Sequence, residues 1–135
     1  MVILAADGQF SYVHTRAVCK AEPGVGLVDA ASGQAEFDFH TIAGTIVGFW
    51  TPEYAKSINI SGWHLYFLTE DRAGGGHLLD VAGSMLKAQV QHLDDFRMAI
   101  PESPEFLRAD LTRDPSRALD KEERHAGVKR TQHGT

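Results

Sequence analysis

Three side chains that can do chemistry lie close together in the middle of the chain. His64 and Tyr66 belong to the apolar run WHLYFL, and His77 follows a polar, glycine-rich segment. Alternate residues of a β-strand share a face, so His64 and Tyr66 point the same way. If residue 66 or 68 lies opposite residue 77 in a hairpin, His77 points to that face as well. The three side chains then converge.

Converging imidazole and phenol groups suit a metal, because zinc takes three or four nitrogen, sulfur or oxygen ligands. Two histidines in a hairpin are nevertheless more often packed or hydrogen-bonded than metal-bound. Gly74, Gly75 and Gly76 precede His77. They either allow a close backbone approach beside a site or form an ordinary flexible turn. The spacing leaves these alternatives open.

The elements that must position these residues are predicted to be strands first and helices last. Aromatic, β-branched and alternating runs predict strands at residues 9–18, 35–40, 45–50, 63–68, 77–81 and 84–93, with a further candidate at 94–100. A short helical turn is expected from Pro52 to residue 56.

Two helix-start signals lie near the C-terminus. Residues 103–111 begin with Ser103 as a cap, followed by Pro104 and Glu105, and residues 114–125 repeat the pattern with Asp114 and a proline. Strands followed by helices predict an α+β fold, with one domain built on a mixed or antiparallel sheet and C-terminal helices. We expect this domain to span residues 1–120 and a tail to span 121–135.

Composition narrows the class of protein. The 135 residues fit one domain, and 43% of them are hydrophobic. The formal charge of −5 disfavours nucleic acid as a partner. Cys19 is the only cysteine, so no intrachain disulfide or thiolate zinc cluster can form. No apolar run approaches the length of a membrane span, and the expected location is the cytoplasm.

Longer motifs around the three side chains resemble a known family. They are GTIVGFWTP at residues 44–52, INISGWHLYFLTEDR at 58–72 and GGHLLD at 75–80. The resemblance continues through FSYVHTRAVCK at 10–20 and PESPEFLRADL at 101–111. Together they resemble the C-terminal part of acetolactate decarboxylase, which implies the fold of that C-terminal domain. The family's N-terminal domain, with one active-site glutamate, has no counterpart here.

The resemblance implies a set of site residues. The family binds zinc through three histidines, and the first and third of these positions fall on His64 and His77. The second position is Tyr66, a phenol whose pKa near 10 makes it a poor zinc ligand at neutral pH. The family's active-site arginine corresponds to Arg16.

The resemblance also implies a reaction and its proton donor. The family is a carbon–carbon lyase that converts 2-acetolactate, a 2-hydroxy-3-oxo acid, to acetoin and carbon dioxide. Zinc is the electron sink, and Arg16 pairs with the carboxylate or the enolate. A glutamate near the C-terminus, corresponding to Glu122 or Glu123, delivers the proton.

Two other functions stay open because of Tyr66. The first is a metal-independent isomerase or cyclase in which Tyr66 donates to a substrate oxygen, His64 is the acid or base, and Arg16 binds an anion. Trp50 and Trp63 would then line the pocket, unless they only pack in the core. The second is a non-catalytic domain that binds a small molecule or assembles. Whichever function holds, a homodimer is an expected partner state, because the missing domain would leave apolar sheet surface that another subunit could cover.

Overall fold

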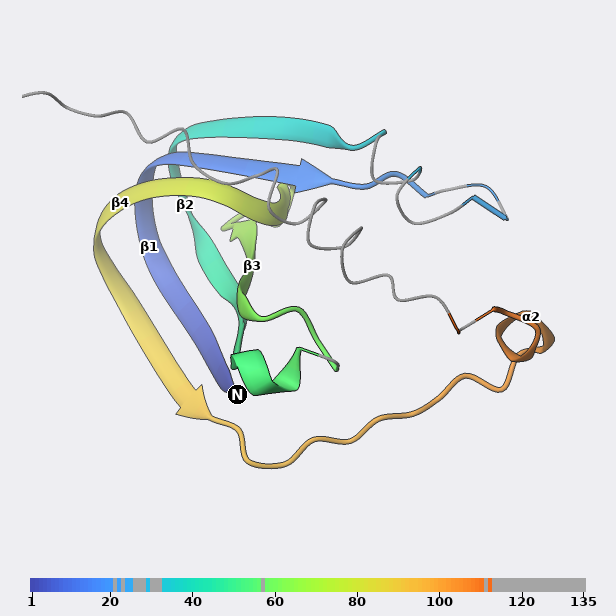
Figure 1. Ribbon diagram of the computed structural model, residues 1–135. Coiled ribbons are helices and arrows are strands. Elements are labelled where there is room, and N and C mark those ends of the chain that lie inside the picture. Colours follow the sequence, from blue (N-terminus) through green and yellow to red (C-terminus); the bar gives the residue numbers. More distant parts are fainter. Residues whose placement is uncertain are drawn as a thin grey trace, which may run out of the picture.

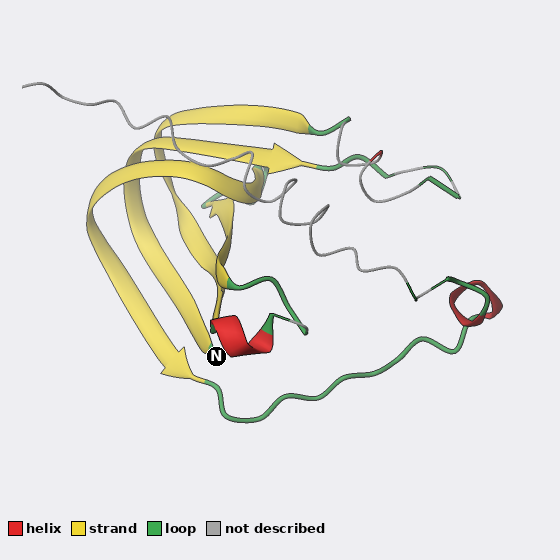
Figure 2. Ribbon diagram, viewed as in Figure 1, coloured by secondary structure: helices red, strands yellow, loops and turns green. Residues whose placement is uncertain are grey.

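The computed structural model describes residues 1–20, 22, 24, 25, 29, 33–56, 58–110 and 112. Four strands form a closed barrel in the order β1-β2-β3-β4, and every neighbouring pair is antiparallel. Figure 1 shows the three long strands bending around the barrel, and Figure 2 shows how little helix accompanies them. The strands are β1 (Val2–Ala17), β2 (Ala35–Thr51), β3 (Gly62–Thr69) and β4 (Gly75–His92).

The long strands are longer than the sequence predicted. Residues 35–40 and 45–50 were expected as two strands, yet both belong to β2, and 77–81 and 84–93 likewise fall mostly within β4. Thr41 in β2 and Met85 in β4 have positive φ angles of 50° and 56°. Each of these residues is a local irregularity in its strand. Because pairing with β1 resumes on both sides of it, the strand bends there and continues.

The barrel interior holds a small apolar core of Ala6, Phe10, Val13, Ile46 and Phe67. The rings of Phe10 and Phe67 meet edge to face at 5.4 Å between centroids. Complete burial stabilises the fold by roughly 1.5–3 kcal/mol for each large apolar side chain. Gly48 lets β2 approach β3 closely, because a Cβ at this position would meet the backbone oxygen of His64.

The C-terminal helices are the part of the predicted fold that is wrong for the described residues. The helical turn after Pro52 is confirmed as η1 (Glu53–Ala55), a 3₁₀ turn. Helix α2 begins where expected, with the Phe106 N–H donating to Ser103 Oγ at 3.2 Å, but it covers only Pro104–Leu107.

Helix α2 has no buried residue and lies away from the barrel (Figure 1). A helix of one turn is marginal in water without a packed face, and this explains why it does not extend. Residues 94–100, a candidate strand, form none in the structure. The helix expected at 114–125 and the tail expected at 121–135 lie outside the described residues. The described chain is therefore an antiparallel β structure rather than an α+β domain with C-terminal helices.

Within the described ranges, no helix is both long enough and apolar enough to cross a membrane.

Candidate functional site

The hairpin of β3 and β4 places the candidate site residues. Tyr66 lies directly opposite His77, one of the two registers expected from the sequence. Across the other ladder of β3, His64 is opposite Phe49 and Tyr66 is opposite Val47. Because opposed residues share a face, all these side chains lie on one side of the sheet.

A hydrogen-bonded turn holds this register. The Thr69 N–H donates to the Gly74 carbonyl at 2.9 Å, and the Thr69 hydroxyl donates to Asp71 Oδ1 at 2.6 Å. The Ala73 N–H donates to the same carboxylate oxygen at 2.9 Å. The hydroxyl of Thr69, followed by the Ala73 N–H, holds the pKa of Asp71 below its usual value.

The two imidazoles and the phenol form a compact cluster. The His64 and His77 rings stand nearly perpendicular with centroids 4.8 Å apart, and the Tyr66 ring lies 5.4 Å from each of them. His64 Nε2 and the Tyr66 hydroxyl oxygen are 3.2 Å apart and share a hydrogen bond. When Nε2 carries the proton it donates to the phenol oxygen, and the phenol O–H can then donate elsewhere.

This cluster faces outward from the barrel. The flanking residue Phe67 is 2% exposed in the core, whereas Tyr66 is 46% exposed. The alternation of the strand therefore separates the two tasks of β3: one face fills the interior and the other presents polar groups to solvent.

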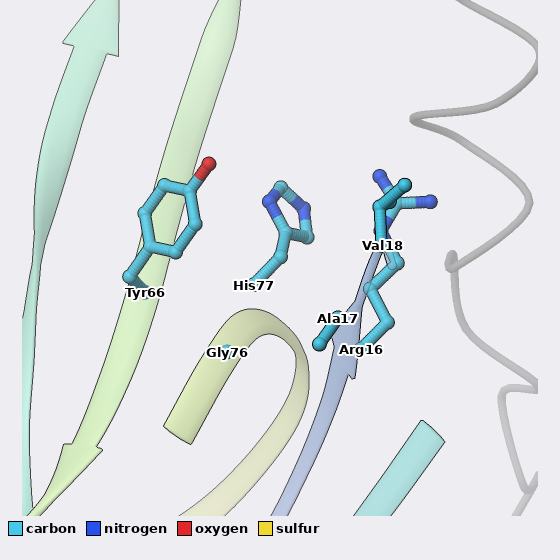
Figure 3. Close-up of a pocket in the computed structure, with 6 residues that line it drawn as sticks. All are labelled: Arg16, Ala17, Val18, Tyr66, Gly76 and His77. Atoms are coloured by element: carbon cyan, nitrogen blue, oxygen red, sulfur yellow. The ribbon is translucent and has the colours of Figure 1, made fainter. Parts of the chain in front are cut away.

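Arg16 reaches the cluster from the end of β1. It is opposite His77 in the ladder between β1 and β4, and only 6% of it is exposed. Its Nη1 donates to Gln34 Oε1 at 3.2 Å. Figure 3 shows the Arg16 guanidinium, the His77 ring and the Tyr66 hydroxyl pointing to the same side.

These residues enclose a pocket of about 280 Å³. Its lining is Arg16, Ala17, Val18, Tyr66, Gly76 and His77. The structure thus brings together Arg16, Tyr66 and His77, while His64 contacts the pocket's phenol from the side. A buried cation beside hydrogen-bonding rings can bind an anion and stabilise negative charge that develops next to it.

The structure does not bring the two tryptophans into this pocket. Trp50 on β2 and Trp63 on β3 lie opposite each other. Trp50 is 37% exposed to solvent and Trp63 is 54% exposed. Neither lines the pocket, and neither is buried in the core. Glu122 and Glu123 lie outside the described residues.

Sequence reasoning missed Gln34 as the residue that contacts Arg16. The ladder pairs Arg16 with Glu36, which places Gln34 diagonally across from Arg16. Only the exact pairing of β1 with β2 could have identified it, and the sequence does not give that register.

The donors present fall short of the zinc site that the family resemblance implies. His64 and His77 supply two imidazoles, and the third position is a phenol hydrogen-bonded to His64. His14 is 3.1 Å from Glu36, and His40 packs beside Tyr12, so neither joins them. Across the described ranges, no group of three His, Cys, Asp or Glu side chains could hold a metal ion. The described set is one ligand short of a three-histidine zinc site.

Comparisons with known proteins agree with the motifs. The alpha-acetolactate decarboxylase of Methanosarcina mazei is 43% identical over 119 residues, which cover 87% of this chain and 41% of that protein. The enzyme of the same name from Bacillus licheniformis is 43% identical over 108 residues, covering 79% of this chain and 43% of that protein. The chain therefore spans less than half the length of these curated relatives.

The fold agrees as well. The crystal structure of alpha-acetolactate decarboxylase from Bacillus subtilis strain 168 matches with a TM-score of 0.83 at 33% identity, over 90% of this chain and 53% of that chain. The family model of alpha-acetolactate decarboxylase matches residues 1–113. With motifs, sequence and fold in agreement over most of its length, this chain belongs to the alpha-acetolactate decarboxylase family.

Proposed function

We propose that this chain carries the reactive surface of a carbon–carbon lyase that removes carbon dioxide from a small 2-hydroxy-3-oxo acid, with 2-acetolactate as substrate and acetoin as product. The observation that supports this most is that Arg16, Tyr66 and His77 line one pocket. All three fall on positions that the family resemblance marks as active-site positions, with Tyr66 standing in place of a histidine.

Arg16 is the carboxylate-binding group in this proposal. Its guanidinium offers a planar fork of donors that matches a carboxylate in two parallel hydrogen bonds. Its burial, with 6% exposed, removes competing water and strengthens the attraction. The Gln34 amide accepts from one guanidinium nitrogen and restricts the direction in which the fork points.

The bond that breaks joins the carboxylate carbon to C2 of the substrate. Its electron pair moves into a C2–C3 double bond, and the C3 carbonyl oxygen takes the negative charge. The Tyr66 hydroxyl and a His77 N–H donate to that oxygen and stabilise it. Protonation of C2 then gives acetoin, with Glu122 or Glu123 as the expected acid. The described residues offer two of the three histidine ligands that the family's zinc site needs. In this proposal the Tyr66 hydroxyl and the His77 N–H therefore act as the electron sink in place of zinc.

Activity of the purified chain on 2-acetolactate tests the proposal. We expect release of carbon dioxide and acetoin, with kcat/KM lowered about 10²–10³-fold in Tyr66→Phe, as for loss of one oxyanion donor. Arg16→Ala should raise KM as well. Tyr12→Phe is the matched control, because Tyr12 is also a strand tyrosine with a hydrogen-bonded hydroxyl, which donates to Asp38, away from the pocket. Carbon dioxide release that is absent, or equal in all four proteins, contradicts the proposal.

The hydrogen bond between His64 and Tyr66 favours a second candidate. A phenol held by an imidazole is an acid–base pair suited to metal-independent isomerisation or cyclisation of another anionic substrate, with Arg16 as the anion clamp. Consumption of a 2-hydroxy-3-oxo acid without carbon dioxide release identifies this function instead of the lyase.

A further inference from the structure

A second hollow lies at the end of the barrel where β1 ends and β4 begins. It has a volume of about 560 Å³, twice that of the pocket around Arg16. Its lining is mainly apolar and consists of Ala17, Phe37, Phe39, Phe67, Leu68, Arg72, Ala73 and Gly74, Gly75, Gly76. We call it the phenylalanine mouth.

The three rings of the phenylalanine mouth lie on the interior side of the sheet. Phe39 is opposite the buried Val13, and Phe37 is opposite the buried Thr15. The Phe39 and Phe67 rings are 5.7 Å apart. The mouth is therefore the open end of the apolar core, and Phe37 remains 46% exposed there.

The mouth and the pocket around Arg16 meet at the rim of the barrel. Ala17 and Gly76 line both of them. Both rim residues are small, and the two hollows share this part of the rim.

Three glycines let the chain pack closely against its neighbours at the mouth. A Cβ at Gly74 would come within 2.9 Å of the Phe39 ring. At Gly75 it would meet the Phe67 carbonyl oxygen, and at Gly76 it would come within 2.5 Å of the Arg16 carbonyl oxygen. The chain therefore approaches its neighbours closely here, as only glycine allows.

We propose that the phenylalanine mouth binds an apolar substituent of the substrate, so that this chain prefers 2-hydroxy-3-oxo acids with a branched or aromatic group over 2-acetolactate. The inference rests on the proposed function and names the substrate class of that same site. Arg72 is the one charged side chain among the residues that line the mouth, and its positive charge suits an acid. Small-molecule sites have volumes of roughly 300–1,000 Å³, a range that the outer pocket reaches only together with the mouth.

A substrate series measures this preference. We expect kcat/KM for carbon dioxide release to rise from 2-acetolactate through its ethyl and isobutyl homologues to a benzyl homologue. The expected gain is roughly four-fold for each methylene buried against the rings. If kcat/KM stays constant or falls as the substituent grows, the inference is overturned. If carbon dioxide is released from 2-acetolactate and from none of the larger substrates, the inference fails but the proposed function stands.

Two variants locate the effect. Ala73→Leu narrows the mouth and Phe37→Ala removes a ring. Both residues line the mouth but not the pocket around Arg16, and both positions are exposed enough to accept the change. Each should lower kcat/KM for the benzyl substrate at least ten-fold and leave 2-acetolactate within about two-fold. The matched control is Val90→Ala, an exposed β4 residue outside both hollows. Equal effects of the two variants on short and long substrates overturn the inference.

Binding of unreactive acids separates the two proposals. Calorimetry compares the binding of 2-hydroxy-2-methylpropanoate with that of 2-hydroxy-2-methyl-3-phenylpropanoate. Neither acid has the C3 ketone that decarboxylation needs. Tighter binding of the phenyl acid, lost in Phe37→Ala, supports the mouth even if no substrate releases carbon dioxide. Equal or absent binding of both acids counts against it, whatever the chain's activity.

Discussion

A phenol between two imidazoles offers different chemistry from an imidazole in the same place. Neutral imidazole has a lone pair for zinc at pH 7, whereas a phenol with a pKa near 10 keeps its proton and donates it in hydrogen bonds. Tyr66 supplies the phenol, and its hydroxyl oxygen lies 3.2 Å from His64 Nε2. Its identity therefore decides whether the cluster binds a metal or acts through hydrogen bonds.

The Tyr66→His variant should gain zinc. Three outward imidazoles would complete the ligand set, and we expect about one zinc per chain by elemental analysis, against far less in the unmodified protein. Met85→His, at an exposed position on β4 away from the cluster, is the control. If Tyr66→His holds no more zinc than the unmodified chain, the cluster is not a zinc site that lacks only one ligand.

Thr15 should limit stability. It is completely buried, and its hydroxyl has no hydrogen-bond partner among the residues described. Thr15→Val keeps the shape and removes the unsatisfied group, so the free energy of unfolding should rise by about 1 kcal/mol in urea denaturation. Thr51 is equally buried but accepts a hydrogen bond from Asn59, so Thr51→Val should give no gain. A loss of stability in Thr15→Val would refute this account.

The candidate site could be predicted in part at the residue scale. The two-residue period put His64 and Tyr66 on one face, and the hairpin correctly added His77. Arg16 came from the family motif alone. The contact of Gln34 with Arg16 depends on cross-strand register, and the exposure of Trp50 and Trp63 depends on which face turns outward, neither of which local sequence specifies.

The turn between β3 and β4 is the element that aligns Tyr66 with His77. Asp71 holds it through Thr69 and Ala73, and its pKa is lowered by these hydrogen bonds. A carboxylate whose folded pKa is depressed stabilises the fold above its unfolded pKa. That contribution is lost as pH falls through the folded pKa.

Asp71→Asn should therefore weaken the protein at neutral pH and reduce its sensitivity to acid. We expect the urea midpoints of the variant and the unmodified chain to differ at pH 7 and to converge well below the usual aspartate pKa of about 3.9. Asp95→Asn, which removes only an exposed ion pair with Arg97, is the control. A difference that is the same at both pH values would show that Asp71 does not act through its charge.

Element boundaries were less predictable than element types. Thr41 and Met85 adopt left-handed backbone angles inside β2 and β4, which local sequence suggests as breaks between strands. Pairing with β1 along nearly the whole length carries both strands through these positions. Helix α2 shows the opposite case, since its start signal is correct and no packed face extends it.

At the scale of the whole molecule, apolar side chains lie exposed around the reactive cluster. Val47, Phe49 and Leu68 on the same outer face are each about two-fifths exposed, at 41%, 40% and 43%. Surfaces of this kind are typical of protein interfaces. This is the surface on which the expected homodimer depends.

Sedimentation velocity tests self-association. We expect a concentration-dependent dimer, weakened at least ten-fold by Phe49→Ser and unaffected by Met85→Ser, whose side chain is exposed on β4. A monomer at every concentration contradicts the prediction, and this face then does not mediate self-association.

An outward-facing reactive cluster can evolve separately from the fold that carries it. Substitutions at exposed positions usually change stability by no more than about 0.5 kcal/mol, whereas those in a core cost several times as much. Tyr66 is exposed, and His64 and His77 are half-buried on the face that points away from Phe67, so new side chains there leave the interior packing in place. Natural variation or a laboratory library can thus exchange ligands, acids and hydrogen-bond donors at these three positions on an unchanged barrel, and each exchange changes the chemistry that the cluster offers.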